Sequence, residues 1–237
     1  MRKINYHQVK DLQELVELRK NIEYCICKKH TGKMEGFWSL STSVIDNEFC
    51  QIKQKCAACV CSKCYAEALL KCRSNQAKKL HFAYELLTKA VYPLEAFPVL
   101  NVLMFRFESF GDLATAEQAI NYFQLCRANP AVTFTLWTKN PWLIQEAIDA
   151  GESKPENLII IYSSPRLNVP EAPRYDFIDK VFTVYTADYA IENDVNINCG
   201  SADCKGCRRC YDLENSERYV SEMLKQEQSK YYKAVGI

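Results

Sequence analysis

The sequence predicts an α/β protein whose sheet has about six mostly parallel strands, either open or curled into a partial β/α barrel. Strand-like and helix-like segments alternate through the second half of the chain, and such segments normally form a parallel sheet covered by helices. Hydrophobic residues make up 48% of the 237 residues, which is enough for a substantial core. Glycine occurs only 7 times and no block repeats at a fixed period, which argues against a flexible linker or a solenoid.

The first third of the chain is expected to contribute one strand and two helical regions. Apolar residues between His7 and Ile22 follow helical spacing and predict an amphipathic helix. Residues 37–43 (FWSLSTS) are rich in aromatic and hydroxyl side chains, which is typical of a strand. A long helix-forming stretch follows at 65–92, with a break expected near Ser74.

The rest of the chain supplies most of the sheet. Strands are expected at 99–107, 132–138, 157–162, 180–186 and 195–199, and helices at 115–127, 141–150 and 215–233. Asn140 and Pro141 fit the start of the second of these helices, and Gly151 fits its end. We expect a single domain over 1–237, with an amino-terminal helical extension (1–36), a partial barrel (37–198) and a carboxyl-terminal cysteine cluster with a helix (199–237).

Charge and hydropathy exclude several classes of protein. The chain has 30 Lys and Arg against 29 Asp and Glu, so bulk attraction to nucleic-acid phosphates is not expected, although a local basic patch remains open. No apolar run approaches the roughly 18–20 residues that a membrane helix needs. The polar amino terminus lacks the apolar centre of a signal peptide. We therefore expect a soluble, cytoplasmic protein with no membrane partner.

Thirteen cysteines, most of them in two short segments, indicate metal binding in this reducing compartment rather than a disulfide scaffold. The first group contains Cys56, Cys61 and Cys64, in a C-x4-C-x2-C spacing. Cys50 and Cys59 lie nearby, and each is either a fourth ligand or a spare thiol. The second group consists of Cys199, Cys204, Cys207 and Cys210. These spacings favour an iron–sulfur cluster, with zinc as the main alternative.

The remaining cysteines have simpler interpretations. Cys126 and Cys72 each share a helical face with apolar residues, so we expect both in the core. Cys25 and Cys27, with His30 close behind, fit either a metal site or a strand whose side chains alternate between faces.

Polar residues follow two of the expected strands and form a candidate cofactor-binding or substrate-binding pocket. Glu108, Ser109 and Asp112 follow the strand at 99–107, and Lys139 follows the next one. Because the carboxyl ends of parallel strands meet at one edge of a sheet, these four side chains are expected to line a pocket above the cluster. An equally weighted alternative is that Asp112 only caps the next helix. No phosphate loop, GxGxxG fingerprint or nucleophile elbow is present, and no catalytic residue is assigned.

The segments FWSLSTS, Cys61-Ser62-Lys63-Cys64-Tyr65-Ala66, FESFGD, TLWTKNP and Cys204-x2-Cys207-x2-Cys210-Tyr211 together resemble the phage gene-product-88-like family. More loosely, the chain is similar to radical S-adenosylmethionine (SAM) proteins. The resemblance spans about 33–211. It implies a radical-SAM-like partial barrel, one or two [4Fe–4S] clusters held in loops after the first and last strands, and location in a host-cell cytoplasm. Radical SAM proteins carry a GGE-like glycine pair at the position that FESFGD occupies here. The cysteine motifs therefore favour SAM as a cofactor, and the absent glycine pair argues against it.

Two functions follow as expectations. One is a radical-SAM-like enzyme, in which a three-cysteine cluster leaves one iron open and the substrate is an unknown small molecule or macromolecule. The other is a non-catalytic redox or structural protein with iron–sulfur or zinc centres. A zinc-stabilised nucleic-acid protein is a third, weaker reading. The four cysteines of the second group suffice to close a centre, whereas the best spacing in the first group uses three.

Overall fold

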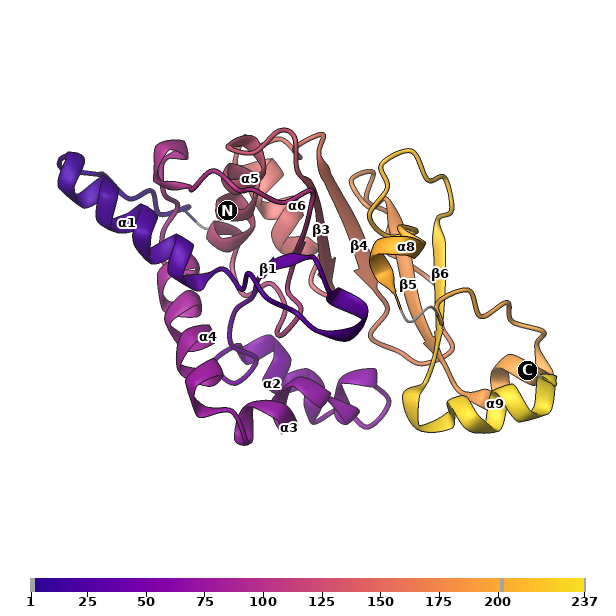
Figure 1. The fold of residues 1–237 in the computed structure, drawn as a ribbon. Coiled ribbons are helices and arrows are strands. Elements are labelled where there is room, and N and C mark those ends of the chain that lie inside the picture. Colours follow the sequence, from indigo (N-terminus) through magenta and orange to yellow (C-terminus); the bar gives the residue numbers. More distant parts are fainter. Residues whose placement is uncertain (1–2, 201–202, 237) are drawn as a thin grey trace.

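The computed structural model describes residues 3–200 and 203–236, which form an α/β structure around one six-stranded sheet (Figure 1). The strands are β1 (Trp38–Leu40), β2 (Met104–Phe107), β3 (Thr133–Thr138), β4 (Leu158–Ser163), β5 (Lys180–Tyr185) and β6 (Tyr219–Met223). Every neighbouring pair is parallel, and the spatial order is β1-β2-β3-β4-β5-β6. The predicted α/β class with a parallel sheet of about six strands is confirmed.

The order of the strands positions the candidate sites. A doubly wound sheet reverses its strand order at one point, and ligands bind at that reversal. This sheet follows the chain from β1 to β6 without a reversal. Its winding is consistent with a partial β/α fold, in which the connecting loops at the carboxyl ends of the strands gather at one edge.

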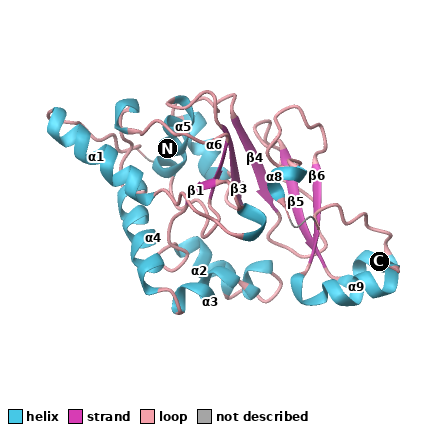
Figure 2. Ribbon diagram, viewed as in Figure 1, coloured by secondary structure: helices cyan, strands magenta, loops and turns pink. Residues whose placement is uncertain are grey.

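The helices fall mostly between the strands (Figure 2). The α-helices are α1 (Leu12–Cys25), α2 (Glu48–Gln54), α3 (Tyr65–Lys71), α4 (Ser74–Leu87), α5 (Ala116–Arg127), α6 (Trp142–Asp149), α7 (Ala187–Glu192), α8 (Cys204–Cys207) and α9 (Gln228–Val235). The short 3-10 helices are η1 (Gly32–Met34), η2 (Val60–Lys63), η3 (Leu94–Ala96) and η4 (Lys225–Glu227). Side chains cap the starts of four α-helices: Asp11 for α1, Asn47 for α2, Thr115 for α5 and Asp203 for α8 each accept from a backbone amide of the first turn.

One face of the sheet packs against helices and forms the main core. Phe105, Phe107 and Phe134 are fully buried there, and the ring of Phe107 stacks on that of Tyr122 from α5 with centroids 4.1 Å apart. Burying a side chain of this size stabilises the fold by about 1.5–3 kcal/mol. Because residues of a strand alternate between faces, Met104 and Arg106 must point to the other face.

The second face, here called the inner face, carries a smaller apolar cluster. Met104 from β2 packs with Phe37 and Tyr211, and Trp137 from β3 lies against them. The partly buried thiols of Cys204 and Cys210 belong to the same cluster. The segment with the second cysteine group therefore folds back over the inner face, and α8 lies on the opposite side of the sheet from α5 and α6 (Figure 1).

Several sequence-based boundaries were wrong in the carboxyl-terminal third. The sixth strand is Tyr219–Met223, inside the stretch expected as a helix at 215–233, of which only α9 is helical. Residues 195–199 form no strand, and only Cys199 makes an isolated bridge, to Glu222. The strand has a short YVSEM pattern, with Val220 and Met223 buried and Tyr219 exposed. Because the strand is short and polar residues flank it, the alternation of buried and exposed side chains is too brief to be recognised in the sequence.

Smaller differences concern the other elements. The strand expected at 99–107 begins only at Met104, and the helix at 65–92 is divided at Cys72 and Arg73 and ends at Leu87. Cys126 is fully buried, as predicted. Cys72 is exposed, contrary to prediction, because α3 ends before it.

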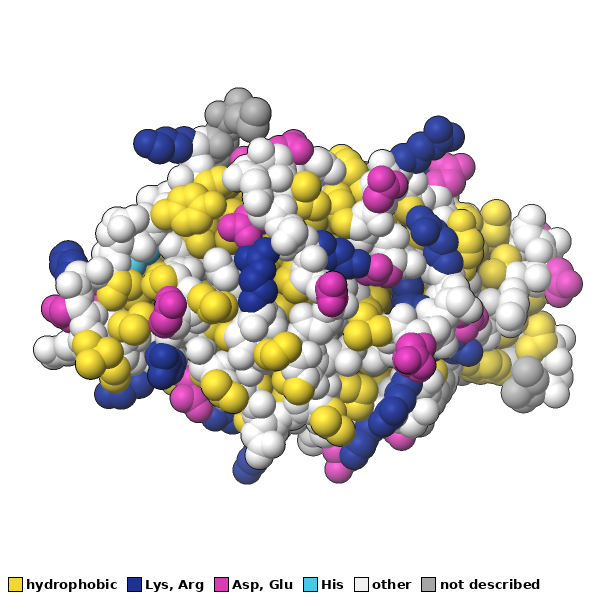
Figure 3. Space-filling model, turned by 90° about the horizontal axis from the view of Figure 1, so that it is seen from above, with side chains coloured by type: hydrophobic (Ala, Val, Ile, Leu, Met, Phe, Trp, Pro, Cys, Tyr) yellow, Lys and Arg dark blue, Asp and Glu magenta, His cyan; other side chains and the backbone are white. Residues whose placement is uncertain are grey.

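The surface is chemically mixed. Seen from above, Lys and Arg side chains alternate with Asp and Glu among hydrophobic ones, and no broad area carries a single charge (Figure 3). Within 3–200 and 203–236, no helix combines the length and the apolar character needed to cross a bilayer.

Candidate metal centres at two cysteine groups

The first cysteine loop (residues 56–64) lies over the carboxyl ends of the strands. Cys59 forms an antiparallel bridge with Arg166, and the Val60 amide donates to the carbonyl of Pro165, 2.8 Å away, just beyond β4. The hydroxyl of Tyr65 donates to the carbonyl of Ser109, 3.0 Å away, just beyond β2. These contacts hold the loop at the edge where β/α folds carry their reactive groups.

The thiols of the first cysteine loop differ in environment. Cys56 is exposed, Cys61 and Cys64 are half-buried, and Cys59 is buried. The Cys59 thiol accepts from the Cys61 amide at 3.4 Å. A hydrogen bond from the Cys61 thiol lowers the pKa of Cys59 to about 6, and the same bond raises the pKa of Cys61. Cys59, which the best sequence spacing leaves out, therefore lies next to a predicted ligand.

Cys50 lies apart from these contacts, on α2. It is buried in a small apolar cluster together with Ala66 and Leu70, and the half-buried Cys64 packs against that cluster. Burial is the main cause that raises the pKa of Cys50. This environment favours a neutral, packed thiol.

Asp112 and Lys139 come together beside the first cysteine loop. The Asp112 carboxylate accepts from the Thr138 hydroxyl at 2.6 Å and from the Lys139 amide at 2.9 Å. Burial raises the pKa of Asp112. Burial opposes the charge on Lys139, but Asp112 and Cys61 nearby raise its pKa above the ordinary value. Thr115, and not Asp112, caps α5.

Glu108 points away from this edge. It is only 4% exposed, and its carboxylate accepts from the Gln118 side chain at 2.8 Å and from the Tyr122 hydroxyl, both on α5. It also accepts from the backbone amide of Thr42 at 3.3 Å. Burial raises the pKa of Glu108 to about 8. The structure thus brings Asp112 and Lys139 to the first cysteine loop and commits Glu108 to the helix-covered core.

Ser109 lies between these two arrangements. Its amide donates to the Ser41 hydroxyl at 2.9 Å, and its carbonyl accepts from Tyr65. The Ser109 hydroxyl is shielded from solvent and has no hydrogen-bond partner. The Ser109 hydroxyl is therefore an unused polar atom among the predicted pocket residues.

The second cysteine loop (residues 199–210) lies between β5 and β6. The resemblance implied a position after the last strand, and the strand at 219–223 corrects this. The Cys199 amide donates to the carbonyl of Ser221 at 2.9 Å, which fixes the start of the loop on β6. Cys204 and Cys207 lie on α8, whose first turn is capped by Asp203.

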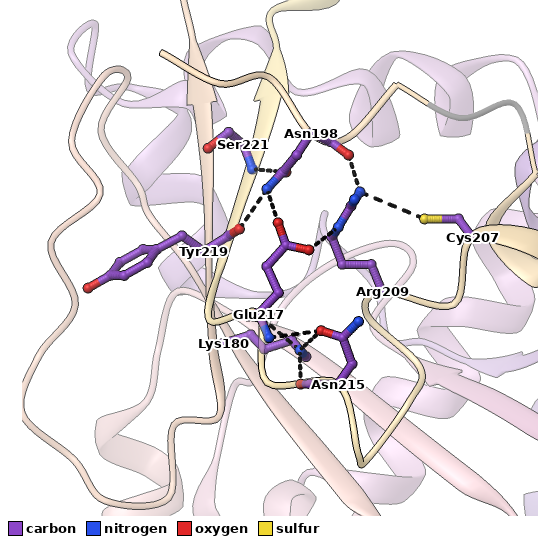
Figure 4. Close-up of polar contacts among 8 residues, drawn as sticks. All are labelled: Lys180, Asn198, Cys207, Arg209, Asn215, Glu217, Tyr219 and Ser221. Atoms are coloured by element: carbon purple, nitrogen blue, oxygen red, sulfur yellow. Dashed lines mark hydrogen bonds and ion pairs between the residues drawn. The ribbon is translucent and has the colours of Figure 1, made fainter. Parts of the chain in front are cut away.

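A polar clamp holds the two ends of the second cysteine loop together (Figure 4). Arg209 forms an ion pair with Glu217 and donates to the Asn198 carbonyl, and its guanidinium lies 3.9 Å from the Cys207 sulfur. The Asn198 side chain donates to Glu217 at 2.6 Å and accepts from the Ser221 amide at 2.8 Å. These contacts fix residues next to Cys199, Cys207 and Cys210 before any ligand is present.

The thiols of the second group influence one another's ionisation. Burial, with smaller contributions from the charges of Glu222, Cys204 and Cys207, raises the pKa of Cys199 to about 11. Burial also raises the pKa of Cys210 to about 12, with added repulsion from Cys199 and Cys204. The four thiols are therefore close enough to repel as thiolates, and a bound cation would offset that repulsion.

Arg106 lies beside this group on the inner face. Its guanidinium stacks on the Trp137 ring at 4.0 Å from the centroid and lies 3.8 Å from the Met34 sulfur. Its Nε atom is shielded from solvent and has no hydrogen-bond partner. Within the described part of the chain, Arg106 makes no salt bridge with a carboxylate. Sequence reasoning missed it, although an arginine inside the apolar run VLMFRF was a usable signal.

The segment with Cys25 and Cys27 separates its two thiols. Cys25 is buried in the main core, where burial raises its pKa to about 12. Cys27 pairs with Ser39 beside β1, and a hydrogen bond with His30 lowers its pKa. The two sulfurs therefore lie in different environments and do not share one site.

The donor set fits a metal that prefers sulfur. Both groups offer thiols, the soft ligands of iron–sulfur clusters and zinc, and each has a cation beside it, Lys139 or Arg106. As folded, residues 3–200 and 203–236 contain no three Cys, His, Asp or Glu side chains already arranged around a single ion position. Binding would therefore require the loops to tighten.

In comparisons with known proteins, no family model, no curated protein and no solved structure matches this chain.

Proposed function

We propose that this chain is an iron–sulfur protein of the phage gene-product-88 type, built on a radical-SAM-like partial barrel. The observation that carries the proposal is the folding of the loop with Cys199, Cys204, Cys207 and Cys210 over the inner face, where Cys204 and Cys210 pack in one cluster with Trp137, on which Arg106 stacks. Four thiols of one loop, fixed by the clamp of Figure 4, are the ligands that a closed cluster needs. The unreversed strand order supports the barrel type of winding.

The first group is the candidate for chemistry. Cys56, Cys61 and Cys64 would hold a cluster at the carboxyl edge of the sheet. A [4Fe–4S] cluster with three cysteine ligands supplies an open iron, the property on which reductive cleavage of SAM depends. Lys139 and Asp112 would border this cluster, and the Tyr65 bond to Ser109 would keep the loop against β2.

A non-catalytic redox or structural function is the second candidate. Cys59 lies beside Cys61 and can supply a fourth thiolate, which would close the first centre. Glu108 is already saturated by hydrogen bonds from α5 and Thr42, so it has no free oxygen facing the edge for a cofactor. Zinc in either centre belongs to this second candidate.

Metal and sulfide analysis tests the proposal. Protein expressed with ample iron and purified without oxygen should be brown and bleach with dithionite. Replacing all four cysteines of the second group by serine should remove the iron and sulfide of the second centre. Replacing Cys56, Cys61 and Cys64 should remove the iron and sulfide of the first centre. Cys72→Ser, at an exposed cysteine outside both groups, is the matched control and should keep all of it. Colourless protein with stoichiometric zinc would reject the iron–sulfur assignment.

A second measurement separates the enzyme from the redox or structural protein. Reduced protein is mixed with SAM, its paramagnetic signal is recorded, and 5′-deoxyadenosine is assayed. A changed signal with product supports the open first centre. If neither occurs in the wild type but Cys59→Ser gains the signal change, Cys59 closes the centre and the non-catalytic function holds.

A further inference from the structure

We infer that Arg106 is the counter-cation of the second metal centre, that it promotes metal binding there and that it sets the ease with which the centre is reduced. The inference rests on the proposed function and adds a residue that no cysteine spacing indicates. Its basis is the shielded Nε atom of Arg106, which has no hydrogen-bond partner, on a guanidinium stacked against Trp137 in the inner-face cluster that also contains Cys204 and Cys210.

A buried charge without a partner is costly, and proteins normally pair it. Arg106 has no salt bridge in the described chain, and its neighbours are Trp137, Met34 and Tyr211, of which Tyr211 offers only a neutral hydroxyl as a hydrogen-bond partner. Stacking on Trp137 offsets part of the cost of burying the guanidinium and fixes its plane. It does not neutralise the charge.

The cysteines are the groups that can supply the missing negative charge. Cys204 and Cys210 pack in the same inner-face cluster as Trp137, on which Arg106 stacks, and the charge of Arg106 lowers the pKa of both thiols against the effect of burial. Thiolates become permanent once a metal binds, and a centre held by four of them carries net negative charge. Metal binding would therefore convert an unpaired cation into a paired one.

Several other charges around the second cysteine loop are already engaged. Lys33 pairs with Glu222 at 3.6 Å, and Arg209 pairs with Glu217. Lys180 donates to the carbonyl oxygens of Asn215 and Glu217 at 2.9 and 2.7 Å. Asp203 caps α8. Arg106 thus remains the buried cation of the inner face without a carboxylate partner in the described chain, whereas Lys205 and Arg208 on the loop itself are exposed.

Two consequences follow from one charge. Removing Arg106 should weaken metal retention, because the thiolates lose a favourable neighbour. It should also make one-electron reduction of an iron–sulfur centre harder, because the reduced centre is more negative. We expect about a tenfold change in each equilibrium, which for one electron corresponds to a potential about 59 mV more negative.

The test uses the full chain with Cys56, Cys61 and Cys64 replaced by serine, so that only the second centre is observed. In this background Arg106→Gln and Arg106→Lys are compared with the unchanged arginine. Arg127→Gln is the matched control, because Arg127 also lies over an aromatic ring but pairs with Glu152 at 2.7 Å, on the helix-covered side. Thermal unfolding is followed by circular dichroism to check that each variant folds.

The readouts are the chelator concentration that removes half of the metal and the midpoint potential. Arg106→Gln should lose metal at about one tenth of the chelator concentration that the unchanged arginine requires, and its midpoint potential should be more negative. Arg106→Lys should show smaller changes in both quantities, and Arg127→Gln should show none. If Arg106→Gln misfolds, the comparison of Arg106→Lys with the control still decides, because a displaced charge must change both values. A centre that binds metal normally with unchanged values in both Arg106 variants overturns this inference alone. Absence of metal from the background protein overturns the proposed function and the inference together.

Discussion

The Glu108 carboxyl should make the stability of the fold depend on pH. Its pKa is raised to about 8 by burial, whereas a glutamate in the unfolded chain titrates near 4.3. Between these values the folded chain holds a proton that the unfolded chain has released, so stability is highest at low pH and is lost as the pH rises through about 8. From pH 6 to pH 9 the loss covers about two pKa units, or about 3 kcal/mol.

Glu108→Gln removes this titration. The variant costs some stability at every pH, because an amide replaces an acceptor that faces the Thr42 amide. Its free energy of unfolding should nevertheless change about 3 kcal/mol less than that of the wild type between pH 6 and pH 9. Urea denaturation of both proteins at the two pH values, under reducing and oxygen-free conditions, measures the difference.

A matched control separates this carboxyl from other titrating groups. Glu95→Gln, at an exposed position, should follow the wild type at both pH values. The remaining cysteines and tyrosines are common to all three proteins and cancel in the comparison. Parallel pH profiles for the wild type and Glu108→Gln would refute the placement of Glu108 as a buried, proton-holding group of the core and reopen its assignment to a ligand pocket.

Three further predictions concern packing, backbone strain and the clamp. Phe134→Ala should lower the free energy of unfolding by about 3–5 kcal/mol, since the ring is fully buried between aromatic neighbours, and chemical denaturation checks this. Gly111→Ala should lower the free energy of unfolding by about 1–3 kcal/mol more than Gly32→Ala in the same assay. Both glycines have a positive φ, but a Cβ at Gly111 would lie 2.8 Å from the Thr42 carbonyl oxygen. Glu217→Gln should release iron from the second centre faster than the wild type while the melting temperature changes little, because the ion pair with the half-exposed Arg209 is worth about 1 kcal/mol or less; equal release rates would contradict a positioning function for the clamp.

Local pattern determined much of the secondary structure. The β-branched and aromatic residues around β3, β4 and β5 predicted strands to within one or two residues, because such side chains pack well on a pleated sheet. Helix α5 was predicted from its helix-forming sequence, and α6 also from the flanking Pro141 and Gly151, although Pro141 and not Asn140 is its N-cap residue. The strand β6 was missed, because a five-residue strand flanked by polar residues takes its identity from pairing with β5, which is a long-range contact.

For the sites, the sequence by itself determined which residues are chemically able to bind metal, and only the tertiary structure decided their surroundings. Spacing identified Cys199 to Cys210 as one group, since a short loop brings its own thiols together. Folding that loop onto the inner face, against Arg106 and Trp137, depends on packing between segments about one hundred residues apart in the chain. Glu108 and Asp112 illustrate the same limit: they lie four positions apart, yet one points to α5 and the other to Lys139. A side chain's direction beyond a strand end depends on local φ and ψ, and Glu108 has φ of 53°, which its residue type does not foretell.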